Sequence, residues 1–430
     1  MSLRIALIPL FLGTAISCKT APKDEKVTEK DEPETVAKKA QGASVGEIDW
    51  LQDNYSEAIQ VATRTERPLV IKMWAPWCHT CLSMKEFVLK DPGLVALGDR
   101  FVWLAMDTDR PENDAALKKL PVSSWPTFFV LNPNNEKVLA RHLGAASIRQ
   151  LRDVFALGES AFRNTKGAKS LSTVETLLVK GDQSFQQSTF ETATKSYAAA
   201  LDKAPTDWPL APETAVKWIS SSLKGGGECP LAKAKSYLDI AAQGSTASLA
   251  DYVYYVTKCV DKNAGKVGAK EKQSTLELSS ELIEKALANA AAPLSVDDRS
   301  DSMRILREIK TTLGKAEAAK KIATQQLALL ETTIENAPSP FAAMTYNWPL
   351  LEVSIFLDKT ERVLPTLENS YKALPNEYDP AYRFASALHL LKRNSEALPV
   401  AQKAVQLSYG PRKKRVKDLL VDIEKALSNP

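Results

Sequence analysis

The stretch WAPWCHTC, residues 74–81, decides the fold and the chemistry of this chain. Its two cysteines, Cys78 and Cys81, stand three positions apart. An apolar run of strand length, residues 69–74, precedes them, and helical spacing follows from Cys78 to Leu89. At such a junction, unpaired N–H groups and the helix dipole stabilise a thiolate. We predict that Cys78 is the nucleophile and that Cys81, one turn deeper, is the resolving thiol.

The residues around this stretch alternate between helical and strand patterns. Helical spacing is expected at 56–65, 114–120 and 147–157, and strands at 101–106, 127–131 and 137–142, with a hairpin turn at 132–135. Asp91-Pro92-Gly93 ends the helix that follows the cysteines. The predicted element order is therefore α-β-α-β-α-β-β-α.

This order and four motifs resemble the thioredoxin-like family. WAxWCxxC is similar to the active-site segment of these proteins. A Cys-x-x-Met step, Asp107-x-Asp109 and the segment 125–127 (WPT) resemble the periplasmic branch that includes the reductase domain of the thiol-disulfide interchange proteins. The resemblance implies an α/β thioredoxin-like domain over residues 46–158, with a central mixed sheet flanked by helices.

The resemblance also implies a set of substrate-binding residues. Pro126 matches the family's cis-proline, which aligns an extended substrate beside the cysteines, and Thr127 follows it. Trp77 and Trp125 are expected as an aromatic rim; packing in the core is their alternative. For Trp74 we prefer the core.

Two residues depart from the family pattern. Where the family carries a buried acid that assists proton transfer from the resolving cysteine, this chain has Lys72, so either Lys72 turns outward or the proton path differs. Glu86 is a weak substitute and is expected to be solvated. His79, between the cysteines, is a candidate for tuning the thiolate pKa, with an exposed neutral histidine as the alternative. The direction of electron flow therefore stays open.

A copper site is the metal alternative. Cys78, Cys81, His79 and Met84 are soft ligands, but one Cys-x-x-Cys supplies only two thiolates and Met84 lies at core spacing. We predict that the site needs no metal and no cofactor.

The N-terminus is typical of an exported protein. Residues 1–17 form a short apolar run with small residues at its end, as in a signal peptide. Residues 15–18 (AISC) resemble a bacterial lipobox, which implies that Cys18 is lipidated. Polar residues dominate 18–45, which predicts a disordered tether. We expect a location on the periplasmic side of a bacterial membrane, anchored by lipid at Cys18.

Length and charge bound the remaining possibilities. At 430 residues the chain is expected to hold two or three units. A formal net charge of +4 gives no overall drive toward nucleic acid. The basic run 412–417 (RKKRVK) is expected to be a solvated helix face, with attraction to anionic lipid as the alternative.

After a linker at 159–171, strand signals vanish and helical lengths alternate with turns through 172–430. This pattern predicts an all-α helical-repeat solenoid that resembles tetratricopeptide repeats, whose period is about 34 residues. The residues at matching offsets are Gly181, Ala193, Tyr197, Ala200 and Pro205, then Leu351, Val363, Leu367 and Ser370, which recur as Ala385, Ala397, Ala401 and Ala404. Such an array offers a concave surface for proteins or peptides; a scaffold without a specific ligand is the alternative.

Two cysteines remain, Cys229 and Cys259. They are equidistant from a turn at Gly244 between two expected helices, so their sulfurs should meet. We predict a structural disulfide, worth roughly 3–4 kcal/mol in the chain-entropy model; a second redox pair is the alternative.

Together these patterns predict an extracytoplasmic thiol-disulfide oxidoreductase. Its partners would be protein thiols or disulfides and a redox partner protein, with the helical array holding a partner. The rival hypothesis is an adaptor lipoprotein whose thioredoxin-like domain is a redox-sensitive arm, and copper handling comes third.

Overall fold

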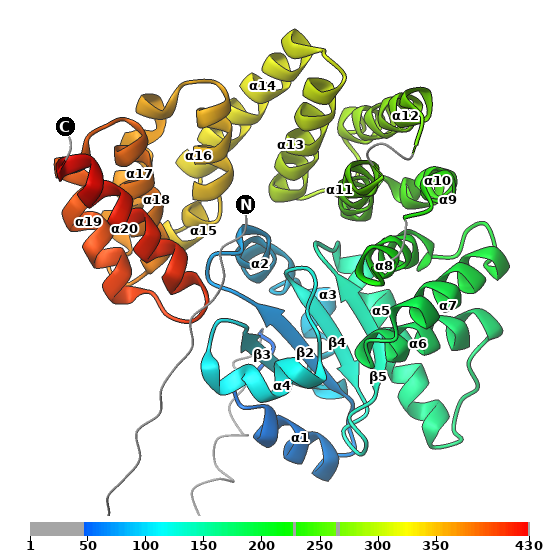
Figure 1. Cartoon of the computed structure of the whole chain (residues 1–430). Coiled ribbons are helices and arrows are strands. Elements are labelled where there is room, and N and C mark those ends of the chain that lie inside the picture. The colour runs from blue at the N-terminus through cyan, green and yellow to red at the C-terminus, as the bar shows by residue number, and fades with distance from the viewer. Residues whose placement is uncertain (1–46, 227–228, 264–266, 429–430) are drawn as a thin grey trace, which may run out of the picture. The chain divides into compact units, whose positions relative to one another are not determined.

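A five-stranded mixed sheet forms the first part of the structure, a computed structural model that describes residues 47–226, 229–263 and 267–428 (Figure 1). The strands are β1 (Trp50–Gln52), β2 (Leu69–Trp74), β3 (Val102–Asp107), β4 (Thr127–Leu131) and β5 (Val138–Leu143), in the order β1-β3-β2-β4-β5. β3 lies parallel to β1 and β2, whereas β4 is antiparallel to β2 and β5. Every residue of β3, β4 and β5 is buried, so both faces of these strands are covered.

Helices cover both faces of this sheet. They are α1 (Tyr55–Arg64), α2 (His79–Ser83) with a π-helical turn at Met84–Val88, α3 (Pro92–Val95), α4 (Asp114–Lys119) and α5 (Ile148–Thr165). Side chains alternate along β2 because successive residues of a strand point to opposite faces. Ile71 joins the core under α1 and α4, and Val70 joins the core under α5.

The observed elements correct three expectations. β1 was not expected. The helix after the cysteines is α-helical only to Ser83 and then widens to a π-helix. The third difference concerns α5, which runs to Thr165, so the passage expected as a linker from residue 159 is helical over its first half.

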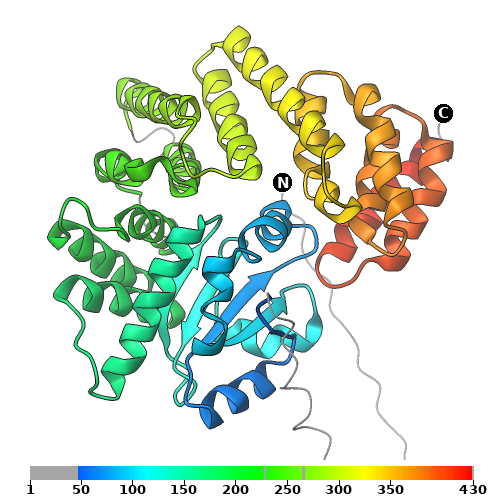
Figure 2. The same cartoon turned by 180° about the vertical axis from the view of Figure 1, so that it is seen from behind.

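The rest of the described chain is helical. It comprises α6 (Thr173–Gln186), α7 (Phe190–Lys203), α8 (Ala211–Lys224), α9 (Leu231–Ser236), α10 (Leu238–Ala241), α11 (Ala247–Lys262), α12 (Ala269–Ala288), α13 (Val296–Thr312), α14 (Ala316–Glu335), α15 (Pro340–Met344), α16 (Asn347–Phe356), α17 (Thr360–Ala373), α18 (Tyr378–Leu390), α19 (Asn394–Leu407) and α20 (Arg412–Ser428). Successive helices pack on one another in chain order, green through yellow to red in both views (Figures 1 and 2). We call α6 to α20 the helical array.

Small residues explain the close helix pairs of this array. Gly181 of α6 faces Tyr197 of α7, and a Cβ atom on Gly181 would lie 2.4 Å from the tyrosine ring. Ala193 and Ala200, on the same face of α7 as Tyr197, are fully buried. The residues that recur at the later offsets, from Leu351 to Ala404, are buried as well. These positions therefore lie in the helix contacts, whereas Pro205, also expected, is exposed beyond the end of α7.

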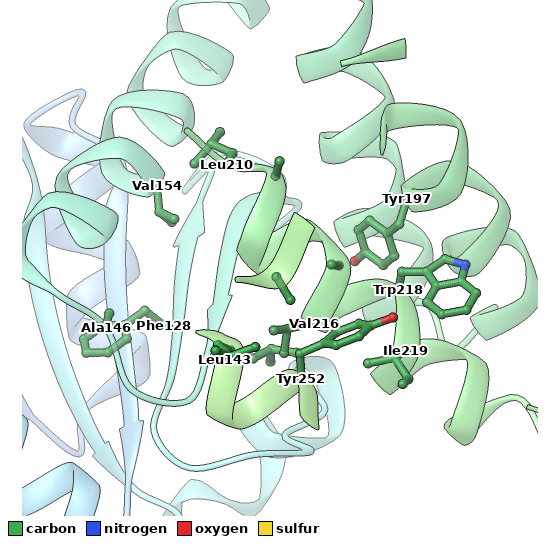
Figure 3. Close-up of a cluster of buried hydrophobic side chains, with 14 of the residues drawn as sticks. Phe128, Leu143, Ala146, Val154, Tyr197, Leu210, Val216, Trp218, Ile219 and Tyr252 are labelled. Atoms are coloured by element: carbon green, nitrogen blue, oxygen red, sulfur yellow. The ribbon is translucent and has the colours of Figure 1, made fainter. Parts of the chain in front are cut away.

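The first helices of the array share their core with the sheet. α6 and α8 pack on β5, and one continuous cluster of buried side chains runs from β4 and α5 into α7, α8 and α11 (Figure 3). Phe128 and Val154 belong to its α/β part, and Tyr197, Trp218 and Tyr252 to its helical part. The linker expected at 159–171 therefore does not separate two cores.

Cys229 and Cys259 form a disulfide beside α11. Their sulfurs are 2.02 Å apart and their Cα atoms 5.5 Å apart. Both residues are buried, and the side chain of Asn263 donates a hydrogen bond to the carbonyl of Cys229 at 2.6 Å. Here the bond joins the segment before α9 to the end of α11.

The signal segment, Cys18 and the whole of the expected tether lie outside the described residues. Among the helices that are described, none is long and apolar enough to span a membrane.

Candidate functional site

The two cysteines of the opening stretch lie where β2 gives way to α2. Cys78 is the N-cap residue of α2, and the structure shows it disulfide-bonded to Cys81, with Cα atoms 5.2 Å apart. The backbone N–H of Cys81 points to Sγ of Cys78 at 3.0 Å. Cys78 retains 5% of its surface and Cys81 only 1%, so Cys78 is the more accessible sulfur.

Two tryptophans stand beside this disulfide. Trp77 and Trp125 have ring centroids 5.4 Å apart, and both pack against the two cysteines. The indole N–H of Trp77 donates to Asp109 at 2.9 Å, and that of Trp125 donates to Thr108 at 2.8 Å. The turn after β3 thus holds both rings while leaving them half-buried. Trp74 also packs on the cysteines from the end of β2.

Pro126 has the conformation that the resemblance implied, whereas the side chain of Thr127 does not have its expected position. The Trp125–Pro126 peptide bond is cis, as the resemblance implied. Thr127 is fully buried, and its hydroxyl donates to the carbonyl of Ser124 at 2.6 Å. The side chain of Thr127 is therefore occupied inside the fold, which corrects its expected role as a substrate-binding side chain.

Cys78 and the two tryptophans line a pocket of about 770 Å³ whose other wall is the helical array. From the α/β domain come Trp77, Cys78, His79 and Trp125. The array contributes aromatic and charged side chains from five helices: Asp251, Tyr254, Tyr255, Lys258 and Lys262 of α11, Asp301 and Arg304 of α13, Trp348 of α16, Arg383 of α18, and Arg412 and Arg415 of α20. The candidate site is thus built by both parts of the chain.

His79 is bound to the array rather than exposed. Its Nδ1 lies 2.8 Å from the buried carboxylate of Asp297, and its Nε2 lies 3.9 Å from Asp301. Burial by itself lowers the pKa of His79, but the two carboxylates outweigh it and raise the pKa to about 9. The imidazole next to Cys78 is therefore protonated at neutral pH, and its charge is set by α13.

We predict that Asp297→Asn lowers the pKa of His79 from about 9 toward the ordinary histidine value of 6.5, because asparagine keeps the shape of aspartate without its charge. The folded-state pKa is the raised one, so this pair stabilises the fold fully below about pH 6.5 and the stabilisation is lost as pH rises through about 9. An NMR titration of the histidine rings, assigned with His79→Gln, measures the shift. Asp239→Asn, on the exposed surface of α10, is the control and should change nothing. An unchanged pKa in Asp297→Asn would show that the ion pair does not form in solution.

Lys72 is buried, so the expectation that it might turn outward is wrong. It lies on the face of β2 that also carries Val70, with its ammonium 5.0 Å from the ring centre of Trp50 and 5.7 Å from that of Trp74. Burial, helped by the charge of Lys85, lowers the pKa of Lys72 to about 7. A large share of the molecules therefore carries a neutral amine there at neutral pH. Glu86 instead pairs with Lys90 at 2.8 Å on the surface of the π-turn.

The loop between α19 and α20 reaches the turn that holds the tryptophans. The hydroxyl of Tyr409 donates to Asp107 at 2.5 Å, and Gly410 approaches so closely that a Cβ atom would lie 2.0 Å from the carbonyl oxygen of Asp109. Burial raises the pKa of Asp109 to about 6, although its hydrogen bond from Trp77 acts in the opposite direction. Only glycine fits at this close contact between Gly410 and Asp109. The contact holds the loop between α19 and α20 against the turn after β3.

A metal ion is a poor fit to the charged groups beside the disulfide. His79, Asp297 and Asp301 are close enough to share an ion, with ligand atoms within 4.8 Å of one another. However, His79 and Asp297 already form an ion pair, and the guanidinium of Arg304 lies 3.4 Å from Asp301. Met84 is buried in the hydrophobic core and is not part of this group of ligand atoms. These groups neutralise one another.

Sequence reasoning missed the residues that the array adds to the site. Asp297 and Arg383 had no signal, because each lies in an ordinary helical pattern, and Tyr409 had none because it lies in a short loop between two helices. Arg412 and Arg415 did have one, the basic run 412–417, but this run was expected to be a solvated face. Lys414, Arg415 and Lys417 are exposed as expected, but Arg412 is half-buried, and Arg412 and Arg415 line the pocket beside Cys78.

Comparison with known proteins agrees with this geometry. The model of a family described as thioredoxin-like matches residues 49–133, which contain β1 to β4 and the cysteine pair. A search of curated proteins gave no match to the chain. The chain thus carries a thioredoxin-like domain whose Cys-x-x-Cys pair suggests thiol-disulfide redox activity.

Proposed function

We propose that this protein is an extracytoplasmic thiol-disulfide oxidoreductase whose helical array, of tetratricopeptide type, holds the partner protein. The observation that carries the proposal is the Cys78–Cys81 disulfide, whose Cys78 lines a pocket shared by the thioredoxin-like domain and the array. Both cysteines are largely buried, but a substrate that enters this pocket can meet Cys78.

The reaction proceeds by two exchanges of sulfur bonds. In the reduced protein the Cys78 thiolate attacks a substrate disulfide, which forms a Cys78–substrate bond and releases one substrate thiolate. The Cys81 thiol then loses its proton and attacks Sγ of Cys78, which frees the second substrate thiolate and forms the Cys78–Cys81 disulfide. Two electrons pass from the pair to the substrate. The reverse sequence oxidises a substrate dithiol.

The residues around Cys78 favour its thiolate. The N–H of Cys81 is 3.0 Å from Sγ, and a protonated His79 adjoins Cys78 in the chain. Both groups stabilise negative charge on the sulfur and so make Cys78 the better leaving group and the attacking thiol. No cofactor is required, because the electrons come from or go to another thiol protein.

The location is supported by the chain's N-terminal sequence. A signal-like run and the residues that resemble a lipobox place Cys18 at the cleavage position, and the polar segment after it suits a tether. We therefore propose anchoring by lipid at Cys18 on the periplasmic side of a bacterial membrane. Fatty-acid labelling of the wild type and of Cys18→Ser tests this part.

Redox cycling of the pair tests the activity. The purified protein is equilibrated in buffers of graded dithiothreitol ratio, and its thiols are alkylated and counted by mass spectrometry. We expect Cys78 and Cys81 to open and close together, while Cys229 and Cys259, which do not line the pocket, stay bonded at ratios that reduce the first pair. A Cys78–Cys81 pair that never cycles with a dithiol and binds Cu(I) tightly would overturn the proposal in favour of copper handling. A Cys81→Ala variant, which cannot resolve the mixed disulfide, would trap the substrate for identification.

A further inference from the structure

The wall of the pocket opposite Cys78 is strongly basic. Six cationic side chains line it: Lys258, Lys262, Arg304, Arg383, Arg412 and Arg415. Two carboxyl groups line it as well. The carboxyl of Asp251 is buried beside Gly144, and burial raises its pKa well above the usual range. Asp301 is shared between Arg304 and His79. An excess of positive charge remains.

Three of these cations are arginines of α18 and α20. Arg383 is buried, pairs with Asp379 at 2.9 Å and lies over the ring of Trp348 at 4.5 Å. The guanidinium of Arg412 lies 3.9 Å from the ring centre of Trp77, the residue just before Cys78. Arg415 donates to the hydroxyl of Tyr382 at 3.2 Å.

Arg412 and Arg415 differ from Arg383 in lacking an acidic partner within the part of the chain that the structure describes. Among the described residues, neither has a carboxylate within 4.0 Å. Burial lowers the pKa of Arg412, and the charges of Arg383 and Arg415 lower it further. Like charges held together in a partly dry pocket repel one another, and a bound anion would remove this repulsion.

The size of the pocket restricts what the anion can belong to. About 770 Å³ is the volume of a pocket for a ligand or a short peptide segment, and it is too small for a folded domain. A substrate of a disulfide exchange enzyme must bring a cysteine to Cys78. A carboxylate a few residues from this cysteine would then reach Arg412, because Arg412 covers Trp77.

Resting on the function proposed above, we propose that Arg383, Arg412 and Arg415 recognise an acidic, extended segment of the substrate polypeptide beside its reacting cysteine. The array thereby selects the substrate, while Cys78 and Cys81 carry out the exchange. The basic run that contains Arg412 and Arg415 thus has a place within the redox site.

Three synthetic peptides test this proposal with the full protein. They contain the same disulfide, flanked by aspartate and glutamate, by asparagine and glutamine, or by lysine. We expect kcat/KM to be about tenfold higher for the acidic than for the neutral peptide, and lower still for the basic one. The advantage should shrink as salt is raised, since the charges are partly exposed.

The double variant Arg412→Gln/Arg415→Gln should bring the ratio of acidic to neutral peptide close to one. Its matched control is Lys414→Gln/Lys417→Gln, which removes the same charge from exposed positions of α20 that do not line the pocket, and which should keep the wild-type ratio. Both values of kcat/KM in this ratio are measured on the same variant. Partial unfolding would lower both values and leave their ratio unchanged.

The outcomes separate this proposal from the function on which it rests. If no peptide is reduced, the oxidoreductase function fails. If all three are reduced equally, or the basic peptide is preferred, only the acidic recognition is overturned. A third outcome is that kcat/KM is no higher for the acidic than for the neutral peptide, while the double variant loses activity on glutathione disulfide. The arginines would then bind a small anionic disulfide, and the proposal of a polypeptide segment in the pocket would be overturned.

Discussion

Cys78→Ser should lower the reduction of insulin or of a model peptide disulfide to the rate of the reductant alone. Serine has nearly the size of cysteine, but its hydroxyl does not ionise at neutral pH and cannot form the mixed disulfide. Cys78 is also the better exposed sulfur of the pair, so Cys81, at 1% exposure, cannot replace it. The measurement is turnover with dithiothreitol as the electron donor.

Two comparisons make the loss interpretable. Cys81→Ser should still attack and should accumulate a mixed disulfide without turnover, because only the resolving step is removed. The melting temperature of Cys78→Ser should equal that of the reduced wild type. Turnover that persists in Cys78→Ser would exclude the proposed mechanism. Unchanged capture of a partner protein by Cys78→Ser, together with no disulfide activity even in the wild type, would favour the adaptor hypothesis.

Asp182→Asn should destabilise the fold by about 3–5 kcal/mol, because it leaves buried cations without their counter-charge. Asp182 of α6 is fully buried. It accepts hydrogen bonds from Tyr197 at 2.7 Å and from Lys217 at 3.0 Å, and from the backbone N–H of Arg141 in β5 at 3.0 Å. The side chain of Arg141 lies 3.6 Å away and is fully buried too. One carboxylate thus joins the sheet to three helices of the array.

Asp202→Asn is the matched control. Asp202 also pairs with a lysine, Lys233 at 3.1 Å, but both side chains are exposed, so the loss should be at most about 1 kcal/mol. Urea unfolding, followed by tryptophan fluorescence, measures both variants. Similar midpoints for the two would contradict a buried network that holds the sheet to the array.

The parts of the fold that sequence predicted well have local causes. β2 and β4 have the predicted bounds, because a proline precedes each apolar run and both runs are buried on both sides. β1 was missed because a three-residue strand has too few residues to show alternation. The end of α5 was misplaced because polar residues fill its exposed side, whereas Ala161 and Phe162 continue its buried side.

The candidate site also contains residues that the sequence predicted and residues that it did not. Cys78, Cys81 and the two tryptophans could be predicted because they lie in short motifs. The burial of Lys72 could not be predicted from its charge, since the surrounding tryptophans and the long alkyl stem make that burial possible. Asp297 and Arg412 could not be predicted either, because they reach the cysteines only through the packing of the helical array. The sequence shows which charged residues the chain has, but it does not show which of them come into contact in the fold.

The bond between Tyr409 and Asp107 joins residues separated by 302 positions. Contacts of such long range form slowly, because the intervening chain must first be ordered. During synthesis, the α/β domain and α6 to α8 can assemble long before α18 and α20 exist. During that interval the pocket beside Cys78 lacks Arg383, Arg412 and Arg415. In the proposed function, a chain that stops short of Arg412 would keep the Cys78–Cys81 pair but would lack two of the three arginines that recognise the substrate.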